Sequence, residues 1–435
     1  MNRTESFHRI SRTALWIAVL AFLLRLAFIS ARERPLFSDE VDYDRLGWTL
    51  AETGRYSDEG HPTAYRPIGY PALVAGIYAV AGRCPWAVHV AQAALDSLSV
   101  LLLWLLAGGG RAGLWAAAIW ALYPSSILYA DLLLPETVFT TLLLAGALLA
   151  ARGAFGSRRG SLLLGGTIGL LVLVKPLALL MLVGLPLAAR LDRVRPTHFA
   201  LLALGASLVI APWLIRNWIV VGYPTPATSV GANLLIGNNP YATGGYSDRV
   251  PPSMIPRESD EGGRDAGEVS SALEYVRKDP VHFIRNGFGK LAHLFGSEGG
   301  MIVWGFHPSP GDPSTRLREK YRSLPLWLHA VVSGPYVLAI LLGTLGLFVQ
   351  PRGPTRAYFL AILGASLATY FVFYGGGRYH YPLMPFFVLF AADWLAGRRA
   401  AGPERPGWKT FAATAIIWEG LLGVWIAEAV LVMRP

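Results

Sequence analysis

The sequence predicts an all-α integral membrane protein with about eleven transmembrane helices, and three observations support this fold class. First, 53% of the 435 residues are hydrophobic and only 15% are charged, whereas roughly 25% of the residues of a soluble domain are charged. Second, apolar runs close to the ~20 residues that cross a bilayer as a helix recur along the chain. Third, arginines gather in short segments between alternate runs, as on the cytoplasmic side of a membrane protein.

The candidate spans follow from these apolar runs. The first run is too long for the apolar region of a signal peptide, so we interpret it as an uncleaved span. The runs 160–174 and 176–190 are short and together could form one long tilted helix. The predicted spans are 13–31, 86–107, 112–130, 136–152, 160–174, 176–190, 198–219, 326–349, 356–374, 381–397 and 409–431.

The basic residues decide between these alternatives. With a cytoplasmic N-terminus, all dense basic clusters fall on the cytoplasmic side only if 160–190 crosses twice, with a turn at Lys175 and Pro176. We therefore expect a plasma-membrane protein, and the richness in Ala, Gly, Arg and Leu suggests the inner membrane of a bacterium. The clusters are Arg111; Arg152, Arg158 and Arg159; Arg190, Arg193 and Arg195; Arg352 and Arg356; and Arg398, Arg399, Arg405 and Lys409.

The chain divides into three regions on this topology. Residues 1–219 form an N-terminal transmembrane module whose first extracytoplasmic loop covers about 32–85. Residues 220–325 form a second extracytoplasmic loop region, and 326–435 hold the C-terminal helices. Short interfacial helices are expected in the loops, at 71–82, 267–278 and 280–295, because these runs are too short or too polar to cross.

Charge and cysteine content exclude several classes of protein. The net charge is +10, but the basic residues lie in membrane loops, so nucleic acid is not an expected partner. The single cysteine, Cys84, excludes an intramolecular disulfide and a cysteine-based zinc site. No spacing of histidines and carboxylates predicts a metal site, so metal ligands are unknown, no cofactor is certain and a divalent cation is left open.

Four carboxylates stand at predicted outer span ends, where ionisable groups are often functional. Asp39 and Glu40 follow the first span, and a carboxylate there could be a general base or a metal ligand; a solvated acidic loop is the alternative. Asp131 and Glu136 flank the outer turn between two spans. Glu136 begins a helix, so capping is its alternative role, whereas Asp131 lies in an otherwise apolar turn.

Four cations stand on the same predicted face, at separate span ends. Arg66 lies between prolines and aromatic residues, which hold the guanidinium in place, and a guanidinium binds phosphate through paired hydrogen bonds. Anchoring to lipid headgroups is the alternative for each cation alone. Together they could converge on one anionic group. The set is Arg66, Lys175, Arg216 and Arg378.

Amide and tyrosine side chains near these ends suit a ligand rich in hydroxyl groups. Asn238 and Asn239 open the second loop in a Gly/Asn-rich stretch, which ordinary turns would also explain. The predicted substrate-binding residues are Tyr65, Glu136, Asn238, Asn239 and Tyr379.

Taken in order, these motifs resemble the membrane glycosyltransferases of the GT-C fold, and most of all their family 39-like branch. That branch includes protein O-mannosyltransferases and the bacterial aminoarabinose transferase acting on lipid A. The resemblance covers about Leu15 to Ala396. Its motifs are Asp39-Glu40, Arg66-Pro67-Ile68-Gly69-Tyr70-Pro71, Asp131 with Pro135-Glu136-Thr137, Pro212-Trp213-Leu214-Ile215-Arg216-Asn217, Gly237-Asn238-Asn239-Pro240, and Arg378-Tyr379-His380-Tyr381-Pro382 with Pro385.

The resemblance implies a sugar donor linked to a polyprenyl phosphate such as undecaprenyl phosphate, used outside the membrane. It maps the family's catalytic carboxylate onto Asp39, its acidic partner onto Glu40 and its second carboxylate onto Asp131. The aminoarabinose enzyme has Glu-Lys-Pro where this chain has Tyr65-Arg66-Pro67. This departure implies Arg66 in place of a phosphate-binding lysine, and it argues against a structural zinc and an aminoarabinose donor.

The expected function is therefore transfer of a hexose or pentose to an acceptor hydroxyl, with inversion at C1 and Asp39 as base. The acceptor could be a lipid, a polysaccharide or a protein, and the sequence does not separate them. Two alternatives from other classes remain, a transporter or flippase of lipid-linked sugars and a non-catalytic membrane scaffold. Release of free lipid phosphate from a donor would distinguish the enzyme from both.

Overall fold

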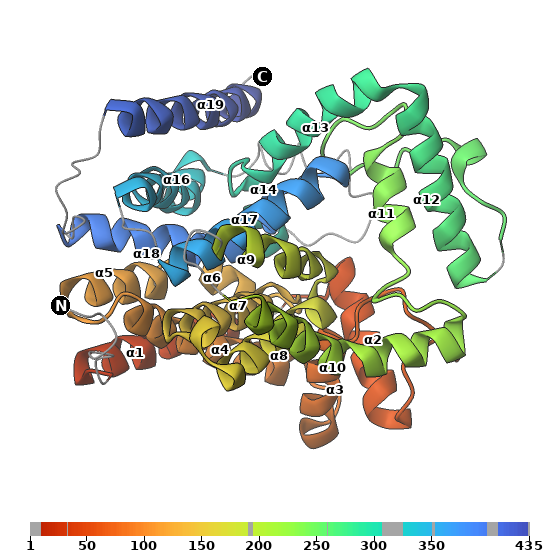
Figure 1. Ribbon diagram of the computed structural model, residues 1–435, viewed down its shortest axis with the longest axis horizontal. Coiled ribbons are helices and arrows are strands. Elements are labelled where there is room, and N and C mark those ends of the chain that lie inside the picture. Colours follow the sequence, from red (N-terminus) through yellow and green to blue (C-terminus); the bar gives the residue numbers. More distant parts are fainter. Residues whose placement is uncertain are drawn as a thin grey trace.

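The computed structural model describes residues 10–32, 34–189, 195–258, 260–306, 325–349, 353–397 and 408–433. The protein is all-α there, apart from one antiparallel pair, β1 (Ser57–Asp58) and β2 (His61–Pro62). In Figure 1 the helices of residues 39–81 and 230–278 lie toward the right, beside the helices that fill the left and centre.

Every predicted span is helical. Among the described residues, six helices are long and apolar enough to cross a bilayer: α1, α4, α10, α16, α17 and α19. The structure therefore supports an integral membrane protein, without establishing that eleven helices cross. The helices at the predicted spans are α1 (Arg12–Ser30), α4 (Pro85–Leu106), α5 (Gly110–Ala121), α6 (Pro124–Ala130), α7 (Glu136–Ala151), α8 (Arg158–Val174), α9 (Met181–Ala189), α10 (Pro196–Val221), α16 (Leu326–Val349), α17 (Pro354–Val372), α18 (Met384–Leu395) and α19 (Trp408–Met433).

Prolines break two of the predicted segments. The run 160–190 forms two helices, because Lys175, which precedes Pro176, is extended (φ −141°, ψ 112°); the residue before a proline disfavours helical geometry. The run resumes as the 3-10 turn η2 (Pro176–Leu180) before α9. The expected span 112–130 is instead two helices, with Tyr123 extended before Pro124.

Helices α8 and α10 pack with their backbones in contact. A Cβ built on Gly165 would lie 2.0 Å from the Leu202 carbonyl oxygen, and one on Gly205 would lie 2.3 Å from the Leu162 carbonyl oxygen. Only glycine fits at such a distance. Small residues at a helix contact are typical of packing inside a bilayer, where dispersion and close approach replace the hydrophobic effect.

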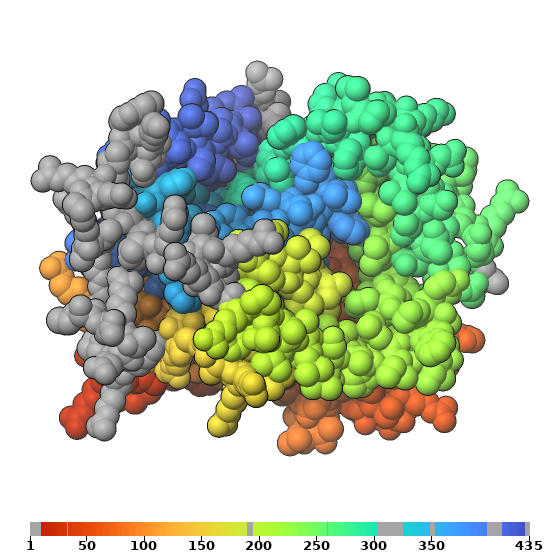
Figure 2. All heavy atoms as spheres, viewed as in Figure 1, coloured from red at the N-terminus to blue at the C-terminus, as the bar shows by residue number. Residues whose placement is uncertain are grey.

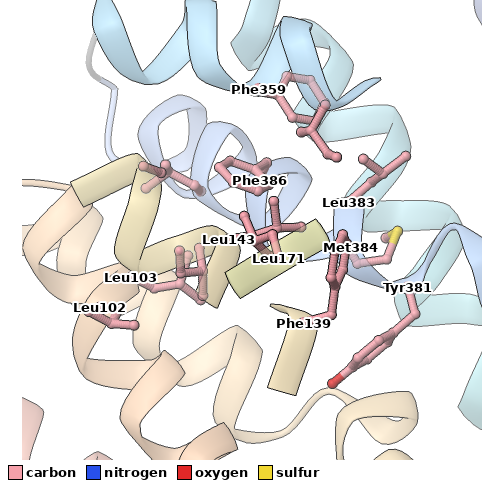
Figure 3. Close-up of a cluster of buried hydrophobic side chains, with 14 of the residues drawn as sticks. Leu102, Leu103, Phe139, Leu143, Leu171, Phe359, Tyr381, Leu383, Met384 and Phe386 are labelled. Carbon is pink, nitrogen blue, oxygen red and sulfur yellow. The ribbon is translucent and has the colours of Figure 1, made fainter. Parts of the chain in front are cut away.

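The largest apolar core centres on α18. Every residue of this helix from Met384 to Asp393 is buried, so it is surrounded by other helices, including α16 and α5. Figure 3 shows Phe386 and Met384 among Leu143 of α7 and Phe359 of α17. Side chains from segments more than 200 residues apart therefore share one core.

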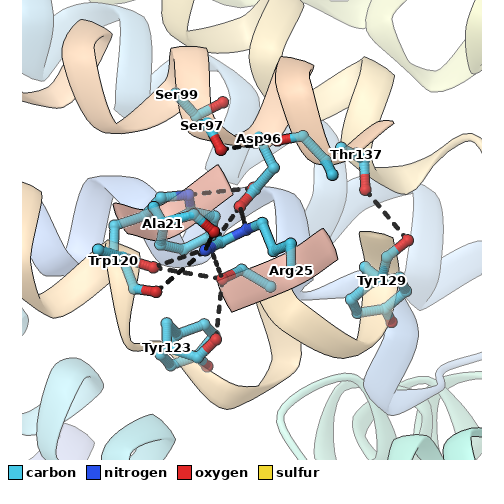
Figure 4. Close-up of polar contacts among 12 residues, drawn as sticks. Ala21, Arg25, Asp96, Ser97, Ser99, Trp120, Tyr123, Tyr129 and Thr137 are labelled. Atoms are coloured by element: carbon cyan, nitrogen blue, oxygen red, sulfur yellow. Dashed lines mark hydrogen bonds and ion pairs between the residues drawn. The ribbon is translucent and has the colours of Figure 1, made fainter. Parts of the chain in front are cut away.

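A fully buried ion pair links α1 to α4. Arg25 donates from Nε to Asp96 at 2.6 Å, and its other donors bind the carbonyls of Ala21, Ala121 and Trp120 (Figure 4). Burying charged groups costs free energy unless their hydrogen bonds are satisfied, and these contacts satisfy them. The pair thus fixes how α1, α4 and α5 meet, and the sequence analysis did not foresee it.

The elements of the two long loops gather at one end of the molecule. In Figure 2 the green atoms of residues 230–300 and the orange atoms of the first loop lie at the same end. The predicted helices at 71–82, 267–278 and 280–295 are present. The elements here are α2 (Asp39–Thr53), α3 (Gly69–Ala81), α11 (Val230–Gly237), α12 (Glu261–Lys278), α13 (Pro280–Leu294) and α14 (Gly299–Phe306), with 3-10 turns η4 (Pro252–Met254), η5 (Gly377–Tyr379) and η6 (Tyr381–Leu383); η1 (Ala154–Gly156) precedes α8.

Candidate active site

The acidic cluster of the first loop forms the first turn of α2. Asp39, Glu40 and Asp42 lie in this turn, where carboxylates are stabilised by the helix N-terminus. Ser38, just before it, has φ 53°, a left-handed conformation that non-glycine residues rarely adopt and that often occurs at functional sites. The cluster is thus held on a helix and is not the solvated loop that the alternative interpretation assumed.

A continuous charge network connects five residues from distant parts of the chain. Asp39 accepts from Arg66 Nη2 at 2.8 Å through one oxygen and from Arg378 Nη1 at 2.7 Å through the other. Arg378 Nε lies 3.5 Å from Glu136 Oε1, which also pairs with Lys175 Nζ at 2.9 Å. Three of the four predicted phosphate-binding cations therefore meet around Asp39 and Glu136.

The network is shielded from water and still reachable. The side chains of Asp39, Arg66 and Arg378 are 18–20% exposed, and Glu136 is fully buried. Burial would raise the pKa of Asp39, but Arg378 and Arg66 outweigh it and hold that pKa well below its usual value. Asp39 is therefore ionised at any physiological pH, and fixed cations here act more strongly on an anion than they would in bulk water.

Arg66 is held from several sides. Its Nη2 also donates to Asp42 at 2.8 Å, and its guanidinium lies 5.5 Å from the ring centre of Tyr43 and 5.3 Å from that of Tyr65. Its Nε is buried without a hydrogen-bond partner among the described residues. A buried N–H without a partner is uncommon in folded proteins and is a feature of functional sites.

Glu40 and Asp131 belong to a second network, centred on Arg34. Arg34 donates to both oxygens of Glu40, at 2.7 and 2.5 Å, and to Asp131. Arg32 lies 3.2 Å from Asp131, and Glu40 also accepts from the backbone N–H of Leu133 at 2.7 Å. Glu40 thus holds Arg34 and ties the start of α2 to the turn after α6.

Arg216 is engaged with the backbone of the first loop. Its Nη1 donates to the Thr63 carbonyl and its Nη2 to the Tyr56 carbonyl, both at 2.6 Å, and Nη1 also reaches Asn217 at 3.0 Å. The guanidinium lies 5.0 Å from the Trp213 ring centre. These contacts fasten α10 to the first loop; the phosphate role of Arg216 stays a prediction.

Asn238 and Asn239 stabilise the end of α11. Asn239 donates to the Leu235 carbonyl at 2.9 Å. Asn238 accepts from the buried Lys290 at 2.9 Å and donates to the Val372 carbonyl at 2.8 Å, so it joins α11, α13 and the end of α17. Burial lowers the pKa of Lys290 to about 8. The substrate contacts predicted for these asparagines stay predictions.

The segment that carries Arg378 is anchored by its neighbours. The Tyr379 ring stacks on Tyr370, with centroids 4.7 Å apart. His380 is fully buried; its Nδ1 lies 2.7 Å from the Leu294 carbonyl and its Nε2 3.2 Å from Glu298. These contacts hold η5 against the start of α14 and so fix where the Arg378 guanidinium points.

Several residues of the site were missed from sequence. Asp42 follows Asp39 by three positions, and this spacing would have placed both on one helix face had α2 been expected. Arg34 is a basic residue at an outer span end, the same signal that singled out Arg66. The pair of Lys290 with Asn238 and the pair of His380 with Glu298 leave no sequence signal, because their partners lie 52 and 82 residues apart.

The chain is similar to solved membrane transferases. No family model and no curated protein matches it. The oligosaccharyltransferase AglB from Archaeoglobus fulgidus, solved with an inhibitory peptide and a dolichol-phosphate, is 14% identical with a TM-score of 0.48; the match covers 97% of this chain and 55% of that chain. ArnT from Cupriavidus metallidurans, bound to undecaprenyl phosphate, is 13% identical with a TM-score of 0.44, over 89% of this chain and 77% of that chain.

Both neighbours are membrane glycosyltransferases of the GT-C fold, the class that the sequence motifs resemble. This chain spans about half the length of AglB. At such identities and TM-scores the likeness concerns the arrangement of helices alone. The activity therefore has to be argued from the residues of this chain.

Proposed function

We propose that this protein is a glycosyltransferase that takes a sugar from a polyprenyl phosphate carrier, such as undecaprenyl phosphate, on the extracytoplasmic side of a bacterial plasma membrane. The observation that carries the proposal is Asp39 lying between Arg66 and Arg378, with Lys175 in the same network. A base and a set of cations for one anionic leaving group are thereby brought together at the end of an apolar helix bundle.

The cations suit a phosphate held at a poorly hydrated surface. Arg66 and Arg378 approach Asp39 from opposite oxygens, so a phosphate placed beside Asp39 would meet both guanidinium groups. Lys175, 12% exposed and 2.9 Å from Glu136, adds a third positive charge. Charge-assisted hydrogen bonds from fixed cations bind phosphate and also stabilise the negative charge that grows on it as it leaves.

The reaction follows from this placement. The acceptor hydroxyl oxygen attacks C1 of the sugar, the bond between C1 and the phosphate oxygen breaks, and the electron pair leaves with the lipid phosphate. The hydroxyl proton passes to the Asp39 carboxylate. A single displacement of this kind inverts C1, as in inverting glycosidases, where a carboxylate activates the nucleophile on the face opposite the leaving group.

Asp39 gains basicity when the donor binds. In the ligand-free site Arg378 and Arg66 stabilise its charged form, which makes it a weak base. A phosphodiester competes for the same guanidinium N–H groups, and each group that turns to phosphate removes part of that stabilisation. The pKa of Asp39 then rises toward its usual value, so the base becomes effective only with the donor in place.

Asp131, which lies in the second network together with Glu40, is proposed to orient the acceptor. No group of three or more His, Cys, Asp or Glu residues suited to a metal ion occurs among the described residues. A divalent cation stays open, and none of the steps above uses one. The sugar and the acceptor, whether lipid, polysaccharide or protein, are likewise left open.

The test compares Asp39→Asn and Arg66→Ala with the wild type in membranes, using radiolabelled undecaprenyl phosphate sugars. Asp39→Asn should lower turnover by at least about 100-fold, since general-base catalysis contributes roughly 10²–10⁴. It should bind undecaprenyl phosphate at least as tightly as the wild type, because two arginines lose a competing carboxylate. Arg66→Ala should weaken that binding about tenfold or more.

Two results would contradict the proposal. Normal turnover in Asp39→Asn would remove Asp39 as the base, and unchanged affinity for undecaprenyl phosphate in Arg66→Ala would leave Arg66 as a lipid anchor. A flippase would move the labelled donor across the bilayer without releasing free lipid phosphate. A scaffold would tolerate both substitutions.

A further inference from the structure

Two tyrosines that the reaction above does not use stand exposed beside the charge network. Tyr65 is 43% exposed and Tyr246 is 61% exposed. They come from different loops, the first from the segment before α3 and the second from the segment between α11 and α12. We call them the tyrosine pair. Their exposure is notable because Tyr43, Tyr370 and Tyr381 nearby are buried.

Both rings are held in place. The Tyr65 ring lies 5.3 Å from the Arg66 guanidinium. The Tyr246 ring packs edge-on against Tyr374 at 5.6 Å, and Tyr374 is linked by its hydroxyl to Tyr379 at 3.1 Å. Tyr246 is thus connected, through two further rings, to the segment that carries Arg378.

The backbone leading to Tyr246 is fixed as well. Gly244 has φ +95°, and a Cβ there would lie 2.9 Å from the Gly289 carbonyl carbon, so glycine is required on both counts. Its carbonyl accepts from the Gly375 N–H at 2.9 Å. The turn is therefore docked on α13 and on the chain just before Arg378, and the exposed ring is presented from a rigid support.

Groups of the site contribute to the raised pKa of Tyr246. Burial raises its pKa first, followed by Asp248, Asp39 and Tyr65. Asp39 and Tyr65 are thus among the groups that act on Tyr246, although they are separated from it by about 200 positions in the sequence. The ring contacts lead to the same cations: Tyr374 packs edge-on against Tyr379 at 5.9 Å, and the Arg378 guanidinium lies 5.1 Å from the Tyr379 ring centre. Tyr65 thus stands beside Arg66, and Tyr246 stands on the aromatic cluster beside Arg378.

From this arrangement we infer that the tyrosine pair binds the sugar of the donor, with Tyr246 as a specificity-determining residue; the inference rests on the proposed function. A sugar attached to a phosphate held by Arg66 and Arg378 has to leave the cations on their solvent side, where these rings stand. The C–H face of a pyranose is apolar and packs on an aromatic ring, while the tyrosine hydroxyl can hydrogen-bond the rim of hydroxyl groups.

The experiment compares the carrier lipid alone with the same lipid carrying a sugar. Binding of undecaprenyl phosphate and of undecaprenyl phosphate carrying glucose, mannose, galactose or arabinose is measured for the wild type, Tyr246→Leu and Tyr246→Phe. Tyr241→Leu is the matched control, because Tyr241 lies in the same loop and is 59% exposed.

The wild type should bind at least one sugar-bearing lipid more tightly than undecaprenyl phosphate. Tyr246→Leu should weaken that ligand about three- to tenfold and leave undecaprenyl phosphate unchanged. Tyr246→Phe keeps the ring and loses the hydroxyl, so it should weaken that ligand less than Tyr246→Leu does. Tyr241→Leu should stay within about twofold of the wild type.

The outcomes separate the two proposals. Equal loss for both ligands in Tyr246→Leu, no loss for either, or no preference of the wild type for any sugar-bearing lipid would overturn the sugar contact while leaving the phosphate site intact. Failure of the wild type to bind undecaprenyl phosphate at all would overturn the proposed function itself.

Discussion

Asp131 and Glu136 begin from similar sequence surroundings, an apolar turn between two spans, and their environments nevertheless differ. Glu136 is fully buried and faces Lys175 and Arg378, so it joins the network of Asp39. Asp131 faces Arg32 and Arg34 instead. Five positions along the chain are enough to separate a carboxylate of the phosphate-binding network from one proposed to orient the acceptor.

Asp131 should make the stability of the protein depend on pH. Burial raises its pKa to about 6, against the opposing effect of Arg34 and Arg32; in the unfolded chain the pKa is about 3.9. The folded state therefore binds this proton more tightly. The resulting stabilisation, up to about 3 kcal/mol, is present below pH ~4 and is lost as the pH rises through ~6.

Thermal unfolding of the detergent-solubilised protein checks this expectation. Between pH 4 and 7 the unfolding midpoint of the wild type should fall more steeply with pH than that of Asp131→Asn, which cannot titrate. Parallel curves for the two proteins would show that the pKa of Asp131 is not raised by folding.

At the scale of elements, the contact between α8 and α10 explains why the short helix α8 is fixed in place. Glycines on both helices let the backbones touch, and Lys175 follows directly at the end of α8. The position of Lys175, and with it the third cation of the network, thus depends on this contact as well as on the break at Pro176.

Gly165→Ala should destabilise the protein while Gly166→Ala should not. A Cβ at position 165 would lie 2.0 Å from a backbone oxygen, whereas one at 166 has its nearest neighbour at 3.9 Å. Overpacking costs about 1–3 kcal/mol, and alanine in a helix otherwise gains up to about 1 kcal/mol over glycine. The thermal midpoints of the two variants in detergent measure the difference. Equal midpoints would contradict the close contact.

At the scale of the whole molecule, the two long loops belong on the same side of the membrane. Their elements, α2 and α3 from one and α11 to α13 from the other, lie at one end of the bundle (Figure 1), and the charge network joins Arg66 of the first loop to Arg378 near the end of α17. The second loop reaches the same site through Tyr246, whose ring packs on Tyr374 just before Arg378. Both loops therefore have to face the donor.

Labelling of single cysteines tests this topology. In a Cys84→Ala background, Ser253→Cys in the second loop should react with a membrane-impermeant maleimide on intact cells (in a Gram-negative host, after permeabilising the outer membrane). Ser157→Cys, before α8, should react only once the plasma membrane is opened. Both serines are exposed, so access to water does not distinguish them. The reverse pattern would invert the orientation and place the proposed site in the cytoplasm.

Composition and the hydropathy pattern were sufficient for the helical elements. Each predicted span is helical because about 20 apolar residues in a bilayer must satisfy their own backbone hydrogen bonds. The helix break at Lys175 and Pro176, predicted from charge bias and proline chemistry, is present; the two crossings on either side of it stay a prediction. The division at Tyr123 and Pro124 was not predicted, although the same proline rule would have indicated it.

The sequence by itself determined that this is a membrane-embedded helical protein, and it singled out Asp39, Arg66, Lys175, Glu136 and Arg378, because a charged residue at the end of an apolar run is conspicuous without any structure. Only the tertiary structure decided which of the charged groups meet. Ion pairs such as Asp39 with Arg378 join positions 339 residues apart, and their formation depends on helix packing that no local pattern encodes. For the same reason Arg216 and Glu40, equally conspicuous in sequence, have partners that only the fold could assign.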